Sequence, residues 1–179
     1  MFYSEKYESP IGPCLLVADE NNLVGVWFEG QKYYCPMKES IQKDDNIQED
    51  AHNYVLRNTK AWLDSYFAGK KPAITELPLK PIGSSFRQDV WSILMDIPYG
   101  KVITYGEIAG QIAETYQKEK MSAQAVGGAV GHNPISIIIP CHRVVGADGS
   151  LTGYAGGLQK KLWLLRHEGA MPLTSVSAP

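Results

Sequence analysis

The sequence predicts an α+β protein: a small N-terminal α/β domain followed by a mostly helical C-terminal domain. Three observations lead to this prediction. Two apolar runs near the N-terminus flank a turn signal, helical spacing of apolar residues prevails after residue 84, and a lysine- and proline-rich stretch separates the two regions. We therefore expect one domain over residues 1–80, a second over residues 81–171, and a tail over residues 172–179.

The N-terminal domain is predicted to hold an antiparallel hairpin and one helix. The runs CLLVAD and LVGVWFE lie on either side of a Glu-Asn-Asn turn signal, and the alternation from Phe2 to Glu8 indicates a further strand. Residues 33–45 have the composition of a loop. Apolar residues from Gln48 to Phe67 recur at helical spacing, so we expect an amphipathic helix there.

The C-terminal domain is predicted to hold three capped helices before its last one. Ser85 with Gln88 and Thr104 with Glu107 each form a capping-box pattern, and Ser122 precedes a third helix. The predicted helices span residues 86–97, 105–113 and 123–132. The second and third of them resemble a helix-turn-helix pair with a long connector.

The third of these helices, AQAVGGAVGH, consists almost entirely of small residues. A glycine inside a helix costs up to about 1 kcal/mol relative to alanine, so we expect another surface to approach this helix closely. That surface is either a neighbouring helix or the backbone and groove wall of DNA. Composition alone favours packing on a neighbouring helix.

Composition and charge exclude several classes of protein. The net charge is −2, residues 1–81 carry 9 basic and 12 acidic side chains, and residues 82–179 carry 8 and 7. A protein that coats nucleic acid through charge would be strongly basic. If this protein binds DNA, we therefore expect modest binding through a local surface. The polar N-terminus is unlike a signal peptide and no apolar run could span a membrane, so we expect a cytoplasmic protein with no membrane partner.

The segment ISIIIPCHRVV holds the most informative residues. We expect an isoleucine strand that ends at Cys141 and is followed by His142 and Arg143, which are costly to bury without partners. Cys141 is either an inert core residue or a nucleophile that a nearby base converts to the thiolate. A histidine that acts as a base needs a partner to hold its tautomer, and Glu168 and Asp148 are both candidates.

Zinc binding is the alternative use of such residues. The sequence has four histidines and three cysteines, but it lacks CxxC, HxxxH and HExxH spacing. Three widely spaced cysteines (Cys14, Cys35 and Cys141) do not form a disulfide framework either. We therefore expect no metal site and a free thiol at Cys141.

In its surroundings, the PCHRV segment resembles the active-site region of the O6-alkylguanine-DNA alkyltransferases, the methylated-DNA–protein-cysteine methyltransferases. GHNPISII precedes it, GSLTGYAGGLQKKLWLLRHEG follows it, and FRQDVWSILMDIPYGKVITYGEIA continues the likeness upstream. The resemblance covers nearly all of residues 84–169 and is diffuse over residues 1–80. It implies a ribonuclease H-like N-terminal domain and a winged helix-turn-helix in the C-terminal domain.

The resemblance also implies a reaction. An alkyl group on O6 of guanine in double-stranded DNA is transferred to Cys141 in one stoichiometric turnover, without a cofactor. His142 acts through a water as the base, Glu168 orients His142, and Asn133 braces the active-site strand and helps to hold the water. Tyr105 gives a hydrogen bond or a proton to N3 of the departing guanine.

The resemblance further implies a pocket for a base flipped out of the duplex. The backbone carbonyls of Cys141 and Val144 accept from the exocyclic amine, the N–H of Ala155 faces O6, and Tyr154 forms a wall. The implied DNA-binding residues are Tyr105, Gly106, Gln124 and Ala147. The small-residue helix would enter the minor groove, which favours DNA contact over internal packing as the reason for its composition.

Two departures from the family pattern carry expectations of their own. Some members place an arginine where this chain has Gln124, so we expect weaker DNA binding or slower base flipping. Cys14, Cys35 and His52 do not match the zinc positions of some relatives, so we expect no zinc.

We also expect a monomer that can cluster on DNA, with O4-alkylthymine as a second candidate substrate. The competing classes are a non-catalytic lesion marker, a cysteine hydrolase and a winged-helix regulator.

Overall fold

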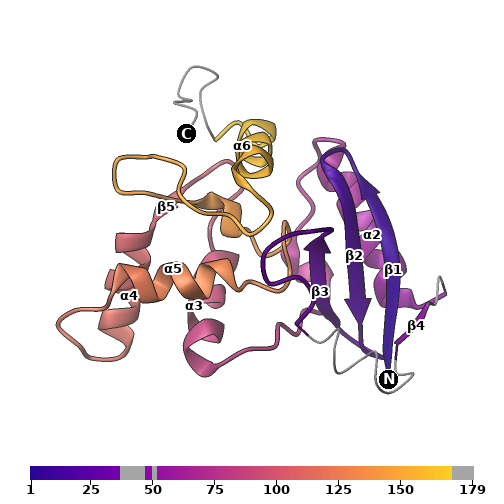
Figure 1. The fold of residues 1–179 in the computed structure, drawn as a ribbon, viewed down its shortest axis with the longest axis horizontal. Helices are drawn as coiled ribbons and strands as arrows, with labels where there is room; N and C mark the ends of the chain where they lie inside the picture. The colour runs from indigo at the N-terminus through magenta and orange to yellow at the C-terminus, as the bar shows by residue number, and fades with distance from the viewer. Residues whose placement is uncertain (37–46, 50–51, 171–179) are drawn as a thin grey trace. The chain divides into compact units, whose positions relative to one another are not determined.

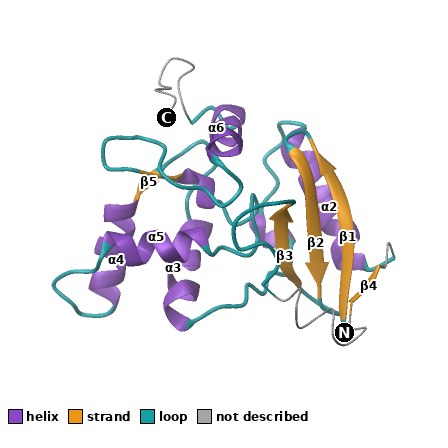
Figure 2. Ribbon diagram, in the orientation of Figure 1, coloured by secondary structure: helices purple, strands orange, loops and turns teal. Residues whose placement is uncertain are grey.

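The structure is a computed structural model that describes residues 1–36, 47–49 and 52–170. The chain forms two compact units: Met1–Ser84 together with Asn133–Ile139, and Ser85–His132 together with the residues from Pro140 on. Strands prevail in the first unit and helices in the second (Figure 2). The α+β class is confirmed. The predicted tail and most of the predicted loop over residues 33–45 lie outside the described residues.

A four-stranded sheet forms the body of the first unit (Figure 1). Strands β1 (Phe2–Ser9), β2 (Gly12–Ala18) and β3 (Leu23–Phe28) are antiparallel neighbours, and β4 (Ile47–Glu49) runs parallel to β1. The predicted hairpin is therefore confirmed. Helix α2 (Tyr54–Phe67) packs on this sheet, and a 3-10 turn, η1 (Ile74–Glu76), follows it.

The first helix begins later than its apolar spacing predicts. Residues 47–49 form β4, and α2 begins at Tyr54 because Asn53 caps it. The Asn53 Oδ1 atom accepts hydrogen bonds from the N–H groups of Val55 and Leu56 at 2.9 and 3.1 Å. An asparagine at this position satisfies N–H groups that have no partner inside the helix, which fixes the helix start. The prediction of a helix from Gln48 was wrong.

The isoleucine run before Cys141 is not a strand, contrary to the sequence prediction. Ile135 makes a single bridge to Val26 in the first unit, and the chain then turns. Ile137 has a φ of +72°, a region that β-branched residues rarely occupy. Four isoleucines (Ile135, Ile137, Ile138 and Ile139) are each 1% exposed or less. A fully buried turn and a fully buried strand both require a continuous run of apolar residues. The sequence pattern therefore does not distinguish them.

Helices α3 (Ser85–Met95), α4 (Tyr105–Thr115), α5 (Ala123–Gly131) and α6 (Leu158–His167) make up most of the second unit. The predicted caps at Thr104 and Ser122 are confirmed. The Glu107 N–H donates to Thr104 Oγ1 at 3.1 Å, and the Thr104 N–H donates to Glu107 Oε2 at 2.7 Å. Ser85 is the first residue of α3 and not the residue before it.

Two short strands tie separate parts of the second unit together. Strand β5 (Ile103–Thr104) pairs in parallel with β6 (Val144–Val145). Strand β5 leads directly into Tyr105 of α4, and β6 directly follows a 3-10 turn, η2 (Cys141–Arg143). The pairing therefore holds the start of α4 beside the turn that carries Cys141.

The inner face of α5 explains its apolar residues. Val126, Ala129 and Val130 are buried, and α5 packs against α3 and α4. The indole Nε1 of Trp91 donates to the Ala129 carbonyl at 2.9 Å.

The outer face of α5 is different. Gln124 and Gly128 are exposed. A Cβ atom added to Gly128 or Gly131 would meet nothing within 4 Å in the described chain beyond the backbone of α5, and one added to Gly127 would meet only the Tyr105 ring at 3.8 Å. Packing inside the described protein therefore does not require glycine at these positions, so the packing interpretation of the composition does not account for them.

We predict that Gly25→Ala in β3 destabilises the protein by about 1–3 kcal/mol, because the new methyl group overlaps the buried Trp27 ring. The matched control is Gly110→Ala in α4, where an added Cβ has open space. That change should be neutral or stabilise by up to about 1 kcal/mol. Urea unfolding followed by far-ultraviolet circular dichroism measures both, and equal effects of the two variants would contradict the prediction.

Candidate active site

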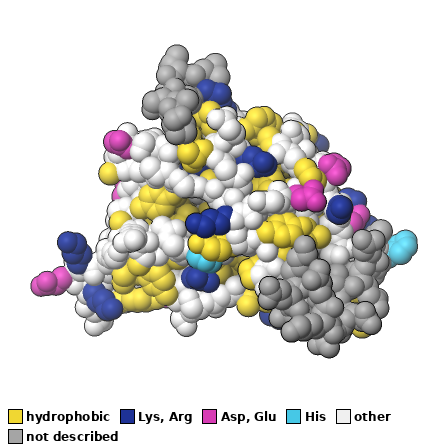
Figure 3. All heavy atoms as spheres, in the orientation of Figure 1, with side chains coloured by type: hydrophobic (Ala, Val, Ile, Leu, Met, Phe, Trp, Pro, Cys, Tyr) yellow, Lys and Arg dark blue, Asp and Glu magenta, His cyan; other side chains and the backbone are white. Residues whose placement is uncertain are grey.

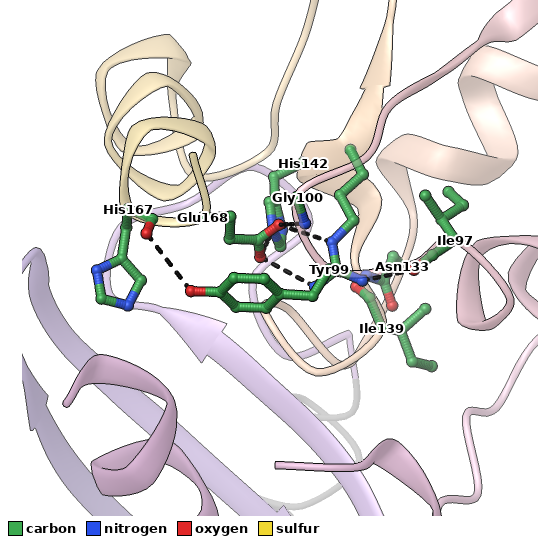
Figure 4. Close-up of polar contacts among 9 residues, drawn as sticks. Ile97, Tyr99, Gly100, Asn133, Ile139, His142, His167 and Glu168 are labelled. Atoms are coloured by element: carbon green, nitrogen blue, oxygen red, sulfur yellow. Dashed lines mark hydrogen bonds and ion pairs between the residues drawn. The ribbon is translucent and has the colours of Figure 1, made fainter. Parts of the chain in front are cut away.

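The buried carboxylate of Glu168 joins two other side chains (Figure 4). Its Oε1 lies 2.7 Å from His142 Nε2, and its two oxygens accept from Arg143 Nε and Nη2 at 2.8 and 3.0 Å. Glu168 is the C-cap of α6, and the other two residues belong to η2. The geometry selects Glu168 over Asp148 as the partner of His142, since Asp148 is exposed and accepts from the Ser150 N–H.

Charges within this cluster set the protonation states. Burial alone would raise the pKa of the Glu168 carboxyl, but the hydrogen bonds from His142 and Arg143 and the charge of Arg143 outweigh it and hold the pKa well below its usual range. Burial lowers the pKa of His142 below its ordinary 6.5, although Glu168 opposes this shift. At neutral pH the pair is therefore a carboxylate and a neutral imidazole.

The two nitrogens of His142 have different surroundings. Nε2 faces the carboxylate of Glu168, so we assign the ring proton to it. Nδ1 is buried and has no hydrogen-bond partner among the described residues. This tautomer leaves Nδ1 with a lone pair that can accept a proton.

Arg143 anchors the cluster to the end of α3. Its Nη1 donates to the Ile97 carbonyl at 2.6 Å, and its guanidinium lies 5.7 Å from the centre of the Tyr99 ring. The Tyr99 hydroxyl in turn donates to the His167 carbonyl at 3.4 Å (Figure 4). The sequence indicates only that Arg143 needs a partner if it is buried, and in the structure that partner is the Glu168 carboxylate.

Cys141 begins the η2 turn and is 5% exposed. The Val144 N–H bonds to its carbonyl oxygen. The sequence predicts a strand that ends at Cys141, on which neighbouring side chains would point to opposite faces. The chain is instead bent into a 3-10 turn at Cys141 and His142, so this alternation does not apply to them.

Tyr105 and Lys161 converge on the loop that follows β6. The Tyr105 hydroxyl donates to the Thr152 carbonyl at 2.7 Å. Lys161 Nζ donates to the carbonyls of Val144, Gly153 and Thr152 at 2.5, 3.0 and 3.3 Å. Burial raises the pKa of the Tyr105 phenol, which is therefore a neutral donor at pH 7.

Sequence reasoning missed Lys161, although a signal was available. Lys161 lies four residues before Leu165 and seven before Glu168, so all three share one face of α6. All three are also buried. A lysine on the apolar face of a helix indicates a buried cation with dedicated partners.

The remaining sequence candidates fall into three groups. Val144 is buried beside the cluster, and Tyr154 and Ala155 lie half-buried in the loop before α6. Gly106, Gln124 and Ala147 are exposed.

Asn133 belongs to the first unit. Its Nδ2 donates to the Ile139 carbonyl at 2.8 Å and its Oδ1 accepts from the Ile135 N–H at 3.0 Å. These two bonds close the turn of chain that leads to Pro140.

Within residues 1–36 and 52–170, no group of three or more His, Cys, Asp or Glu side chains is arranged to hold a metal ion. In the part of the chain that the structure describes, Cys14, Cys35 and Cys141 are buried and form no disulfide. None of the helices in the described ranges is long and apolar enough to cross a lipid bilayer.

Two protein-family models together match almost the whole chain. Residues 2–81 match the ribonuclease-like domain of 6-O-methylguanine DNA methyltransferase, and residues 85–170 match its DNA binding domain. The sequence and the fold therefore place this chain in the class of two-domain DNA alkyltransferases. The chain belongs to the 6-O-methylguanine DNA methyltransferase family.

Individual relatives agree with this assignment. The methylated-DNA–protein-cysteine methyltransferase of Haemophilus influenzae is 39% identical over 166 residues, covering 93% of this chain and 86% of the relative. The protein of the same name from Methanosarcina acetivorans is 42% identical over 172 residues, covering 95% and 99%.

Solved structures share the fold as well. The crystal structure of Mycobacterium tuberculosis O6-methylguanine methyltransferase matches with a TM-score of 0.78 at 38% identity, covering 97% of this chain and 96% of that one. The structure of M. tuberculosis OGT in complex with DNA matches with a TM-score of 0.78 at 37% identity, covering 94% and 93%.

We predict that Arg143→Met lowers the free energy of unfolding at pH 7 by about 3–5 kcal/mol, because the buried Glu168 charge loses a partner. The folded-state pKa of Glu168 lies below its ordinary 4.5. The Glu168 carboxylate therefore contributes to stability above pH 4.5, and this contribution is lost as the pH falls below 4.5.

The variant should accordingly lose less stability than the unsubstituted protein when the pH is lowered from 6 to 3. Urea unfolding at several pH values measures this difference. The control is Arg166→Met, at an exposed position of α6. An Arg143→Met variant with an unchanged acid profile would show that Arg143 does not stabilise the carboxylate.

Proposed function

We propose that this protein repairs DNA by transferring the alkyl group of O6-alkylguanine to Cys141, one alkyl group per protein molecule. The observation that carries the proposal is the buried contact between Glu168, at the end of α6, and His142, on the turn that presents Cys141, within a chain that belongs to an alkyltransferase family. The relatives' name, methylated-DNA–protein-cysteine methyltransferase, describes the same reaction.

The chemistry requires a thiolate and a place for its proton. In the proposed mechanism His142 Nδ1 accepts the Cys141 proton through a water, and Glu168 stabilises the imidazolium that forms. The Cys141 sulfur attacks the alkyl carbon, a new S–C bond forms, and the bond between that carbon and O6 breaks. Two observations support His142 as the base: its imidazole is neutral, and its Nδ1 atom has no hydrogen-bond partner in the described part of the chain.

The departing guanine leaves with the electron pair of the broken bond. Tyr105 stabilises this anion by donating a hydrogen bond or a proton to N3. Its hydroxyl is bonded to the Thr152 carbonyl at 2.7 Å, so the phenol exchanges that acceptor for the base when guanine enters. The thioether on Cys141 has no leaving route in this scheme, which makes the reaction a single turnover.

The base-binding contacts use backbone and small side chains. The carbonyls of Cys141 and Val144 accept from the exocyclic amine of guanine, the Ala155 N–H faces O6, and Tyr154 forms a wall. Each carbonyl already accepts one hydrogen bond, from the Val144 N–H and from Lys161. A carbonyl oxygen has two lone pairs, so these bonds do not prevent either carbonyl from also accepting from the base. Asn133 braces the segment that leads to Cys141.

The proposed DNA surface includes α5, with Gln124, Gly106, Tyr105 and Ala147 around the site. The open space around Gly128 and Gly131 supports a close approach by a DNA backbone or groove wall. On the face drawn in Figure 3, Lys and Arg side chains are scattered and do not form one broad patch. This agrees with a shape-based grip in the minor groove and with modest affinity from Gln124, which brings no charge.

We further propose that the protein acts as a cytoplasmic monomer that can cluster along DNA. Its proposed substrate is double-stranded DNA containing O6-alkylguanine, and O4-alkylthymine is a second candidate substrate.

The direct test is to incubate the protein with duplex DNA that contains O6-methylguanine and to take a mass spectrum of the peptide containing Cys141. We expect a gain of one methyl group per protein molecule, with loss of the methyl group from the DNA. Cys141→Ala should bind the same duplex and leave it methylated.

Other outcomes would select the competing classes. Binding without a methylated peptide would indicate a lesion marker. Demethylation of many duplexes per protein molecule would indicate a hydrolase, and binding that ignores the lesion would indicate a winged-helix regulator.

We predict that Gly128→Glu weakens binding to duplex DNA by about tenfold or more, because it adds bulk and negative charge to a helix face that approaches phosphates. The matched control is Gly110→Glu, an exposed position on α4. Fluorescence anisotropy with a labelled duplex measures both affinities. Equal affinities for the two variants would remove α5 from the DNA surface.

A further inference from the structure

Lys161 is a fully buried lysine of α6, at 0% exposure. Among the described residues, its hydrogen-bond acceptors are three backbone carbonyls, those of Val144, Gly153 and Thr152. No carboxylate among the described residues forms an ion pair with it. Burying a charged ammonium costs several kcal/mol unless other groups compensate, so this arrangement calls for an explanation beyond packing.

The three carbonyls indicate which form of the lysine is present. An ammonium has three N–H donors, whereas a neutral amine has two donors and a lone pair that would face a carbonyl oxygen. Three acceptors around one nitrogen therefore favour the charged form. Burial lowers the pKa of Lys161 to about 8, which still leaves the side chain mostly protonated at pH 7.

Lys161 Nζ donates to the carbonyl of Val144, and the Val144 N–H bonds to the Cys141 carbonyl, so the ammonium lies close to the turn that carries the thiol. Their electrostatic interaction raises the pKa of Lys161 and partly offsets the effect of burial. The interaction is mutual, so the ammonium favours the Cys141 thiolate over the neutral thiol. The same charge lowers the pKa of His142, which helps to keep the imidazole neutral and able to accept a proton.

The carbonyls that Lys161 gathers belong to two separate segments. Val144 follows the η2 turn, and Thr152 and Gly153 belong to the loop before α6. The Tyr105 hydroxyl shares the Thr152 carbonyl, and the Tyr105 ring lies 5.9 Å from Lys161 Nζ. One ammonium therefore fixes both segments that are proposed to line the base pocket.

We propose that Lys161 is a positioning residue for alkyl transfer: its ammonium holds the Val144 carbonyl and the Thr152–Gly153 backbone in place and supplies the positive charge against which the Cys141 thiolate forms. This proposal rests on the proposed function of Cys141. Lys161 acts through the backbone and through its charge, without touching the base.

The test compares Lys161→Met, which removes the charge at similar length, with Lys161→Arg, which keeps it. Lys160→Met, at the neighbouring half-buried position, is the matched control. The first measurement, without DNA, is the rate at which iodoacetamide modifies Cys141 between pH 5 and pH 9, read from the mass of its peptide. Every variant keeps the other titratable and charged groups around the thiol unchanged. These groups are Tyr105, His142, Arg143 and Glu168.

The second measurement is the single-turnover rate of methyl transfer from an O6-methylguanine duplex at saturating protein, together with the affinity for that duplex. In Lys161→Met we expect the midpoint of the iodoacetamide pH profile to rise by roughly one pH unit and the transfer rate at pH 7 to fall by about tenfold or more. Duplex affinity should change by less than about threefold. Lys161→Arg should restore the midpoint but not the full transfer rate, because a planar guanidinium cannot direct three donors to the same carbonyls.

Circular dichroism establishes whether each variant is folded. If Lys161→Met does not fold, Lys161→Gln, which keeps N–H donors without the charge, takes its place. A folded neutral variant with an unshifted midpoint overturns the proposal. If the unsubstituted protein transfers no methyl group while the midpoint still shifts, the proposed function fails and the link between Lys161 and the thiolate stands.

Discussion

The carboxylate of Glu168 is the group on which the second unit's polar core depends. It is buried and carries a charge. Its Oε1 contacts both His142 Nε2 and Arg143 Nη2, and its Oε2 accepts from Arg143 Nε and from the Gly100 N–H. An isolated buried carboxylate would take up a proton, which would leave His142 without the acceptor that fixes its tautomer. Arg143 keeps the carboxylate charged and at the same time bonds to the end of α3. The orientation of the proposed base is therefore set by an arginine that does not act on the substrate.

A second buried cation, Lys161, organises another part of the site. Lys161 joins the chain after Cys141 to the loop before α6, and Tyr105 is bonded to the same loop. The β5–β6 pairing adds a backbone connection between the start of α4 and the same region. The β5–β6 pairing and the Lys161 ammonium therefore hold three segments that are distant in the sequence around the Cys141 thiol. Few apolar contacts could fix backbone carbonyls with comparable directionality, because hydrogen bonds have a preferred geometry and dispersion does not.

Sequence reasoning located the elements whose signals are local. The caps at Thr104 and Ser122 and the N-terminal hairpin were predicted from short patterns that act within a few residues. The helix start at Asn53 was missed because apolar spacing continued upstream into a segment that pairs with β1. The isoleucine run was misread for a related reason: burial on all sides erases the alternation that distinguishes a strand from a turn.

The site was predictable in its residue types more than in its connections. The resemblance supplied Cys141, His142 and Glu168, and from spacing alone Glu168 and Asp148 were equivalent. What separates these two carboxylates is burial at the end of α6, which is a tertiary property. Arg143 and Lys161 show the same limit, because the groups that compensate their charges are backbone carbonyls and a distant carboxylate that no local pattern encodes.

The burial of Cys141 is consistent with a reaction that occurs once. A thiol that is 5% exposed is shielded from most solutes, so its partner has to be delivered to it in a fixed orientation. Flipping a base into the pocket provides that delivery, and its cost is lowest for a base whose pairing is already weakened. In the proposed mechanism the two buried cations serve the same end, since Arg143 orients the proposed base, His142, through Glu168 and Lys161 would favour the thiolate. Reactivity in this protein would therefore arise from charges placed out of solvent before the substrate arrives, which is the condition under which an electrostatic contribution to catalysis is largest.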